Sequence, residues 1–258
     1  IKPLFRDTRE ARIKKKKPAE MPKDSLAIVA LGQAVDPIRI PAVKSFKVPE
    51  NISVVAWLQE MPADTSKNKG IKPAKTSKED SDRADDDKAG GSAVENGMLV
   101  IRQLVSGRQD TIKNASEYVF NKAGQFLLVE TVANKKDSLS RSGVLRWNVQ
   151  KNKGEILSSG QTDYKQLSLS KTGEQAAFLA TGDSAKALQQ FYKLYYFDSK
   201  SDSAKMVADK KSNGIPDNWS INPNSALTFS NNGQRLFFGT APVLPVKDTS
   251  IVDFEVAK

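Results

Sequence analysis

Two residue types are absent from this sequence of 258 residues: cysteine and histidine. Without histidine, the chain cannot build a Ser-His-Asp triad or a Cys-His nucleophile pair from its own residues. Without cysteine or histidine, it lacks the usual ligands of zinc, haem and iron–sulfur clusters, and it can form no disulfide. We therefore predict no catalytic residue, no metal site and no cofactor in this chain.

Long apolar runs are also missing. No segment approaches the ~18–20 apolar residues that a membrane-spanning helix requires, so we expect no membrane span. No signal peptide is visible, but the chain begins at Ile1 rather than Met and stops abruptly at Lys258. These ends indicate a piece of a longer protein, and they leave room for a leader that has been removed.

Acidic residues are outnumbered, with 40 Lys and Arg against 30 Asp and Glu and a net charge of +10. Half of this excess lies in residues 1–20, which hold eight basic and three acidic side chains. The Lys14–Lys17 run could bind nucleic-acid phosphates or anionic lipid. Phe5 is the only aromatic residue nearby, which leaves base stacking unsupported. We interpret residues 1–23 as a solvated basic arm that binds no nucleic acid.

Large apolar residues are almost absent from residues 63–96, where Ile71 and Val94 are the only ones. Such a segment buries too little apolar surface to offset the entropy of ordering it. We expect a flexible polar insertion, because strand-like sequence resumes on both sides. Its aspartates could supply oxygen ligands to Ca²⁺, but they lack the spacing and the glycine of a Ca²⁺ loop, so we favour a solvated tract. These aspartates are Asp80, Asp82, Asp85, Asp86 and Asp87.

A repeated hairpin pattern dominates the rest of the chain. Gly124, Gly173 and Gly233 each come after a strand-like segment, with Asn or Ser three positions before the glycine. A segment that is apolar on both faces comes after each glycine. A second repeated unit consists of a strand, a polar turn and a weaker strand, and it starts at Leu99, Val144 and Leu194. The two units alternate, and the glycines are spaced by 49 and then 60 residues.

Four antiparallel strands that recur every ~40–50 residues are typical of a β-propeller blade. Strands apolar on both faces fit this fold, because each blade is sandwiched between its neighbours. An ordinary β-sandwich also fits turns and apolar strands, but the recurrence of both units in register favours the propeller. We predict an all-β propeller of four-stranded antiparallel blades over residues 24–258, forming an incomplete ring.

The repeats also predict where each blade begins and ends. A half blade at 24–43 precedes full blades at 45–113, 115–158 and 164–208, and residues 225–240 open another blade. The polar insertion falls between the second and third strands of its blade. We expect one buried residue in each first strand, namely Phe120, Leu169 and Phe229. The corresponding residues of the second strands are Leu128, Phe178 and Phe237.

The hairpins Lys122-Ala123-Gly124-Gln125 and Asn231-Asn232-Gly233-Gln234 resemble those of TolB-type propeller repeats. Two spans, Asp24–Glu50 and Pro216–Lys258, carry a closer resemblance. They are similar to the N-terminal propeller of large prolyl-oligopeptidase-family serine peptidases from Bacteroidetes-like bacteria. This resemblance covers most of residues 24–258 outside the insertion.

In that family, a propeller accompanies a C-terminal α/β-hydrolase domain whose nucleophile lies in a G-x-S-x-G turn. This chain has no such motif, and its nearest string, Gly90-Gly91-Ser92-Ala93-Val94, ends in Val. No catalytic residue of the family therefore carries over. The resemblance implies a non-catalytic segment that restricts access and helps admit peptide substrates to a hydrolase domain absent from this chain. It also implies an exported, periplasmic protein.

A function from a different class stays open. The chain could be a free-standing TolB-like propeller that acts as a scaffold for protein partners. The two hypotheses differ in the sequence they require after Lys258, because only the peptidase needs further blades and a hydrolase domain with G-x-S-x-G and His.

Three tryptophans are candidate contacts for a sugar or a peptide. Trp57 and Trp147 lie on predicted strands, where we expect them to pack between blades. Trp219 precedes a predicted blade, close to Gly214 and Pro216. It is the best candidate for an exposed aromatic side chain that contacts a substrate or a partner.

Overall fold

The computed structural model describes residues 1–16, 20–32, 35–61, 97–134 and 137–246. The polar insertion 63–96, with its aspartates, and residues 247–258 lie outside this range. One helix, α1 (Phe5–Ile13), lies in the basic arm, and the other elements of the described part are strands. Within α1, the Arg6 Nε and Glu10 Oε1 atoms form an ion pair at 3.1 Å, one turn apart. No helix in the described ranges is long and apolar enough to cross a membrane.

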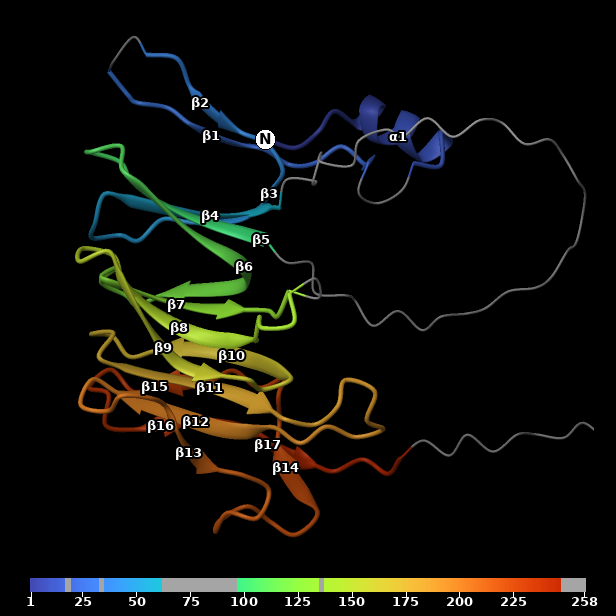
Figure 1. Ribbon diagram of the computed structural model, residues 1–258, viewed down its shortest axis with the longest axis vertical. Coiled ribbons are helices and arrows are strands. Elements are labelled where there is room, and N and C mark those ends of the chain that lie inside the picture. Colours follow the sequence, from blue (N-terminus) through green and yellow to red (C-terminus); the bar gives the residue numbers. More distant parts are fainter. Residues whose placement is uncertain (17–19, 33–34, 62–96, 135–136, 247–258) are drawn as a thin grey trace, which may run out of the picture.

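The strands form successive antiparallel units along the chain (Figure 1). The first unit is a hairpin of β1 (Leu26–Ile28) and β2 (Ile38–Ile40). A first blade comes next, with β3 (Val43–Lys47), β4 (Val54–Glu60), β5 (Gly97–Gln103) and the start of β6 (Gln109–Phe120). The second blade contains the end of β6, β7 (Phe126–Thr131), β8 (Gly143–Asn148) and β9 (Lys153–Ser159).

The third blade is a separate sheet of β10 (Asp163–Leu169), β11 (Gln175–Thr181), β12 (Lys193–Asp198) and β13 (Lys205–Ala208). Two short hairpins end the described chain, and we call them the C-terminal hairpins. One pairs β14 (Trp219–Ile221) with β17 (Thr240–Pro242). The other pairs β15 (Thr228–Phe229) with β16 (Leu236–Phe237).

Strand β6 belongs to two blades, which makes the first two blades one continuous sheet of seven strands. Residues Gln109–Ala115 pair with β5, whereas Ala115–Phe120 pair with β7. The pairing register shifts at this junction, and Asn114 has a φ of 58° there. Asparagine tolerates this left-handed conformation better than most residues, so the strand can change partners without ending.

An apolar layer lies between each pair of neighbouring units. Both faces of β7 contribute, because Leu127 and Val129 pack toward the first blade while Leu128 packs toward the third. The layer between the second and third blades also contains Val144, Leu157, Tyr164, Phe178 and Phe197. Leu179, Leu194, Ile221 and Leu227 fill the layer beside the C-terminal hairpins. Both faces of the inner strands β7 and β11 are covered by these layers, which explains why these strands are apolar on both faces.

The blades converge on their first strands. Strand β10 contacts β6 of the preceding blade and β15 of the C-terminal hairpins, so β6, β10 and β15 lie side by side. Sheets that meet at their first strands and separate toward their last strands form the fan of a β-propeller. Strands β1 and β2 do not pair with β14 to β17, so the described sheets do not close on themselves. The fold is an all-β propeller with an incomplete ring, as the repeats predict.

The three repeat glycines form equivalent turns. At Gly124, Gly173 and Gly233, φ lies between 69° and 79°, and the glycine N–H donates to the carbonyl three residues earlier at 2.9 Å. The Asn or Ser at that earlier position accepts from the backbone N–H two residues after the glycine, at 2.9–3.1 Å. The repeated pattern of residue types along the chain is therefore a pattern of hydrogen bonds.

These turns also stack on one another. A Cβ atom at Gly124 would lie 2.5 Å from Pro49 Cβ, in the turn between β3 and β4. A Cβ atom at Gly173 would clash with the Phe126 ring, and one at Gly233 would lie 2.5 Å from Gln175 Oε1. Phe126 and Gln175 each stand two positions after the preceding glycine, so every turn packs on its predecessor.

The six predicted core residues have three outcomes: two are confirmed, three are only half-buried and one is wrong. Leu128 and Phe178 are fully buried, and the first-strand residues Phe120, Leu169 and Phe229 are half-buried against the apolar layers. The prediction for Phe237 is wrong, because this side chain is 54% exposed. Phe237 lies on β16, and in the described part of the chain β16 pairs only with β15. No described sheet covers its outward face.

Candidate functional site

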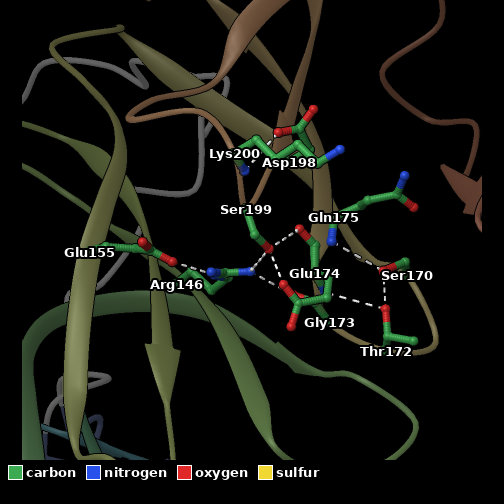
Figure 2. A network of polar contacts seen from close by, with 10 residues as sticks. All are labelled: Arg146, Glu155, Ser170, Thr172, Gly173, Glu174, Gln175, Asp198, Ser199 and Lys200. Atoms are coloured by element: carbon green, nitrogen blue, oxygen red, sulfur yellow. Dashed lines mark hydrogen bonds and ion pairs between the residues drawn. The ribbon is translucent and has the colours of Figure 1, made fainter.

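Arg146 joins the second blade to the third at the end of the molecule where the glycine turns lie (Figure 2). Its guanidinium lies between two aromatic rings, with Cζ 4.6 Å from the Phe126 centroid and 4.9 Å from the Phe197 centroid. Nη1 donates to the Gly173 carbonyl at 2.8 Å, and Nε donates to the Glu155 carboxylate. Arg146 is 7% exposed. A planar cation suits this position, because it can stack on rings and donate at its edge at the same time.

The other polar contacts of Figure 2 hold the adjacent turns. The Ser199 hydroxyl donates to the Glu174 carbonyl at 2.9 Å, and Ser170 Oγ accepts from the Gln175 N–H at 3.1 Å. The Asp198 carboxylate accepts from the Lys200 N–H at 2.8 Å. Each contact satisfies a turn or a neighbouring blade, so we interpret this network as a structural clamp rather than a site of chemistry.

A second polar cluster lies at the opposite ends of the same strands. Glu130, near the end of β7, is 7% exposed and shares the face of β7 that packs toward the third blade. The pKa of the Glu130 carboxyl is raised to about 8, mainly by burial and in smaller part by the nearby Glu117 and Asp163 carboxylates. A hydrogen bond with Ser116 and the charge of Lys165 oppose this shift. Glu130 therefore holds a proton at neutral pH in the folded chain.

Asp163 organises the side of this cluster that belongs to the third blade. The Tyr192 hydroxyl donates to Asp163 Oδ2, and Lys165 Nζ lies 3.9 Å from the same oxygen. Lys165 Nζ also lies 5.2 Å from the centroid of the Tyr192 ring. Burial raises the pKa of the Tyr192 hydroxyl, and the hydrogen bond to Asp163 adds to this shift. Tyr192 thus stays a neutral donor.

This cluster lies along the inner edge of the fan, because Glu117 and Asp163 belong to the first strands β6 and β10. It combines a neutral acid, a carboxylate, an ammonium and a phenol. No histidine exists in the sequence to act as a base beside a nucleophile. No group of three or more His, Cys, Asp or Glu residues among the described ranges could hold a metal ion. The arrangement offers hydrogen-bond donors and acceptors to a polar ligand.

Two of the three tryptophans, Trp57 and Trp147, pack between neighbouring units, as the sequence predicts. Trp57 is 2% exposed in the layer between the β1–β2 hairpin and the first blade, and Trp147 packs against the layer between the first and second blades. Trp219 begins β14 and is half-buried, where it pairs with Pro242 of β17. Its contact with a substrate or partner stays a prediction.

Sequence reasoning missed Glu130, Asp163 and Tyr192. One signal for Glu130 was present, because this carboxyl comes directly after the apolar run Phe126–Val129. A charge on a strand that is otherwise buried on both faces indicates a special environment. No comparable signal marks Asp163 or Tyr192, which come together only across β11, the strand that lies between β10 and β12 in the sheet.

No protein-family model and no curated protein matches this chain. Among solved structures, it is similar to the β-propeller domain of the Trilobed protease from Pyrococcus furiosus, with 11% identity over 74% of this chain and 46% of that chain, at a TM-score of 0.41. The tricorn protease shows 10% identity over 84% of this chain and 18% of that chain, at a TM-score of 0.45. TolB from Acinetobacter baumannii shows 11% identity over 79% of this chain and 40% of that chain, at a TM-score of 0.39.

The chain spans less than half the length of each of these three structures. The identities are too low to transfer an activity or a site residue. The assignment of the fold rests on the strand pairing and the convergence of the first strands. One fold can host many unrelated functions, so the function has to be argued from the side chains of this chain.

Proposed function

We propose that this chain is the non-catalytic propeller segment of a serine peptidase of the prolyl-oligopeptidase kind. In this role it restricts access to a hydrolase domain that these 258 residues do not contain, and it helps admit peptide substrates. The resemblance of the spans Asp24–Glu50 and Pro216–Lys258 supports the family. The absence of histidine and of a G-x-S-x-G turn supports a non-catalytic role.

The observation that carries the proposal is the contrast between the blade faces and the inner edge. The faces are closed by apolar layers, so a peptide cannot pass between neighbouring blades without disrupting a packed core. The inner edge carries polar side chains, including Glu117, Asp163 and Lys165. In a completed ring, a polar path bounded by closed blades suits an extended peptide and excludes a folded protein.

The proposal includes the division of the chain and its compartment. Residues 1–23 form a basic arm, and residues 24–258 form the propeller segment with the insertion 63–96. The partner is a peptide substrate that reaches the hydrolase domain past this segment. An exported, periplasmic location is supported by the resemblance alone.

The experiment compares the intact polypeptide encoded by the parent gene with a version that lacks residues 24–258. Both are titrated with a serine-directed phosphonate, so that rates are expressed per active site. We expect kcat/KM for short peptides to change little and cleavage of long or folded substrates to rise when the propeller is removed. An unchanged preference for substrate length would contradict the proposed role in access.

The alternative of a free-standing scaffold has its own outcome in this experiment. If the intact polypeptide binds no phosphonate and its gene encodes no G-x-S-x-G motif after Lys258, the peptidase proposal fails. A protein-binding propeller would then be the better explanation.

A further inference from the structure

A cavity of about 390 Å³ lies beside the Glu130 cluster, and Tyr192 is part of its lining. Its walls come from the β11–β12 connection, from β12 and from the connection after β13. Small-molecule pockets typically measure ~300–1,000 Å³, with apolar walls and a few polar groups that fix the ligand. This cavity is therefore larger than a single small anion requires, and it is within the range of a peptide residue.

Three lysines, Lys193, Lys210 and Lys211, line the cavity. Lys210 Nζ lies 3.6 Å from the centroid of the Phe191 ring. In the part of the chain that the structure covers, the ammonium groups of Lys193 and Lys211 make no ion pair and no hydrogen bond. An ammonium has three donors, so these lysines have donors to offer to a ligand.

The two carboxylates of the cavity already accept hydrogen bonds from the backbone. Asp183 Oδ2 accepts from the Phe191 N–H at 2.7 Å, and Asp209 Oδ1 accepts from the Lys211 N–H at 2.9 Å. The hydrogen bond from Lys211 lowers the pKa of the Asp209 carboxyl, and the charges of Lys193 and Lys211 lower it further. The cavity thus holds three cations against two carboxylates, which leaves an excess of positive charge.

Aromatic side chains form the rest of the relevant lining: Phe191, Tyr192 and Tyr195. The Tyr195 ring is fixed by stacking on Phe178, with 5.6 Å between the centroids and 3° between the planes. Tyr192 is fixed by its hydrogen bond to Asp163. Two of the three rings are therefore held in place before any ligand arrives, which reduces the entropy cost of binding.

We propose that this cavity binds a peptide carboxylate that lies next to an apolar or aromatic side chain. The lysines bind the carboxylate, and the rings pack on the neighbouring side chain. The carboxylate has two sources, the free C-terminus of a peptide or an Asp or Glu side chain within it. This inference rests on the proposed function and deepens it, because it gives the propeller segment a direct contact with peptides.

The test measures binding to the 258-residue chain by titration calorimetry, with no hydrolysis involved. One pair of probes is acetyl-Gly-Gly-Phe with a free C-terminus and the same peptide with a C-terminal amide. The second pair is acetyl-Gly-Asp-Phe-Gly amide and its Asn counterpart. We expect at least one acidic peptide to bind more tightly than its neutral partner, by about tenfold, and to weaken as salt is added. The acidic peptide that binds identifies the source of the carboxylate.

Variants locate the site. Lys193→Gln and Lys211→Gln should each weaken binding of the acidic peptide by about two- to fivefold, as expected for partly exposed ion pairs. Lys205→Gln is the matched control, because Lys205 is an exposed lysine on β13 that does not line the cavity. When the acidic peptide is added in an NMR titration, the backbone amide chemical shifts should change most at residues 191–193 and 209–211.

Equal binding of acidic and neutral peptides, equal losses in Lys193→Gln and Lys205→Gln, or no binding at millimolar peptide would each overturn the inference. None of these results bears on the exclusion of large substrates. Failure here is therefore distinguishable from failure of the proposed function.

Discussion

Glu130 and Leu179 occupy equivalent positions in successive blades. Phe126 pairs with the last residue of β8, Gln175 pairs with the last residue of β12, and Glu130 and Leu179 each lie four positions later. Both side chains are buried toward the next unit. The second blade therefore has an ionisable acid where the third blade has a hydrocarbon side chain. Because burying a charge is costly, this acid stays protonated.

The protonation of Glu130 predicts how stability depends on pH. In the folded chain its pKa is about 8, whereas the ordinary value is 4.5, so between these pH values the folded state binds one proton more than the unfolded state. The free energy of unfolding should therefore fall as the pH rises from 4.5 to 8. Glu130→Gln should remove this dependence. At pH 9, its free energy of unfolding should exceed that of the wild type by on the order of 3 kcal/mol.

Urea unfolding of both proteins across this pH range measures the effect. Glu50→Gln is the control, because Glu50 is exposed in the turn between β3 and β4 and does not act on the Glu130 carboxyl. Parallel curves of unfolding free energy against pH for wild type and Glu130→Gln would show that Glu130 does not carry the shift.

Gly173 predicts a second effect on stability. It combines a φ of 79° with close packing on the Phe126 ring, whereas Gly160 has a φ of 89° and open space around its missing Cβ. Gly160→Ala should cost about 1 kcal/mol, the strain of a left-handed residue. Gly173→Ala should cost about 3 kcal/mol, because the methyl group also displaces a packed ring. Thermal denaturation of the two variants compares them, and equal losses would mean that the stacked turns tolerate a side chain.

The contrast between these residues shows what the sequence could predict. The glycine turns repeat because each blade needs the same hydrogen bonds, so Gly124, Gly173 and Gly233 reveal the fold directly. Phe237 obeys the same pattern yet is exposed, because its burial depends on a neighbouring sheet rather than on its own strand. The Glu130 cluster depends on contacts between blades that no local pattern records.

At the scale of elements, β6 shows how the repeat is connected. The sequence predicts a boundary between two blades near residue 114, and the pairing partner does change there. The strand nevertheless continues without a loop, because Asn114 takes a left-handed conformation. A local pattern of strands and turns predicts the blades but not their joining into one sheet.

The β4–β5 connection predicts an effect of deletion. Glu60 pairs with Gly97, so the strand ends that flank the insertion are adjacent and a short hairpin turn can join them. Replacing residues 63–96 by a short Asn-Gly turn should leave the melting temperature unchanged or slightly raised, since each doubling of loop length costs only about 0.6 kcal/mol. A large fall in melting temperature by calorimetry would show that the insertion stabilises the blades.

For the whole molecule, the open ring predicts self-association. Apolar side chains are exposed at both ends of the stack: Val29 and Ile38 beside the first hairpin, and Phe237 and Phe238 at the last. The isolated chain should associate as its concentration rises, because contact between copies would remove these apolar side chains from water. Phe237→Lys should weaken this association, whereas Val105→Lys, at an exposed residue of the β5–β6 turn, should not. Sedimentation velocity that shows one monomeric species at every concentration would contradict this prediction.

The proposed function requires that this chain supplies the propeller and that the hydrolytic chemistry lies outside it. The most direct test treats the purified chain and the intact parent polypeptide with a serine-directed phosphonate and maps the label by mass spectrometry. We predict no label and no peptide turnover in the chain, and one label outside residues 1–258 in the intact polypeptide. Stoichiometric labelling of a serine within residues 1–258, together with turnover, would contradict the claim.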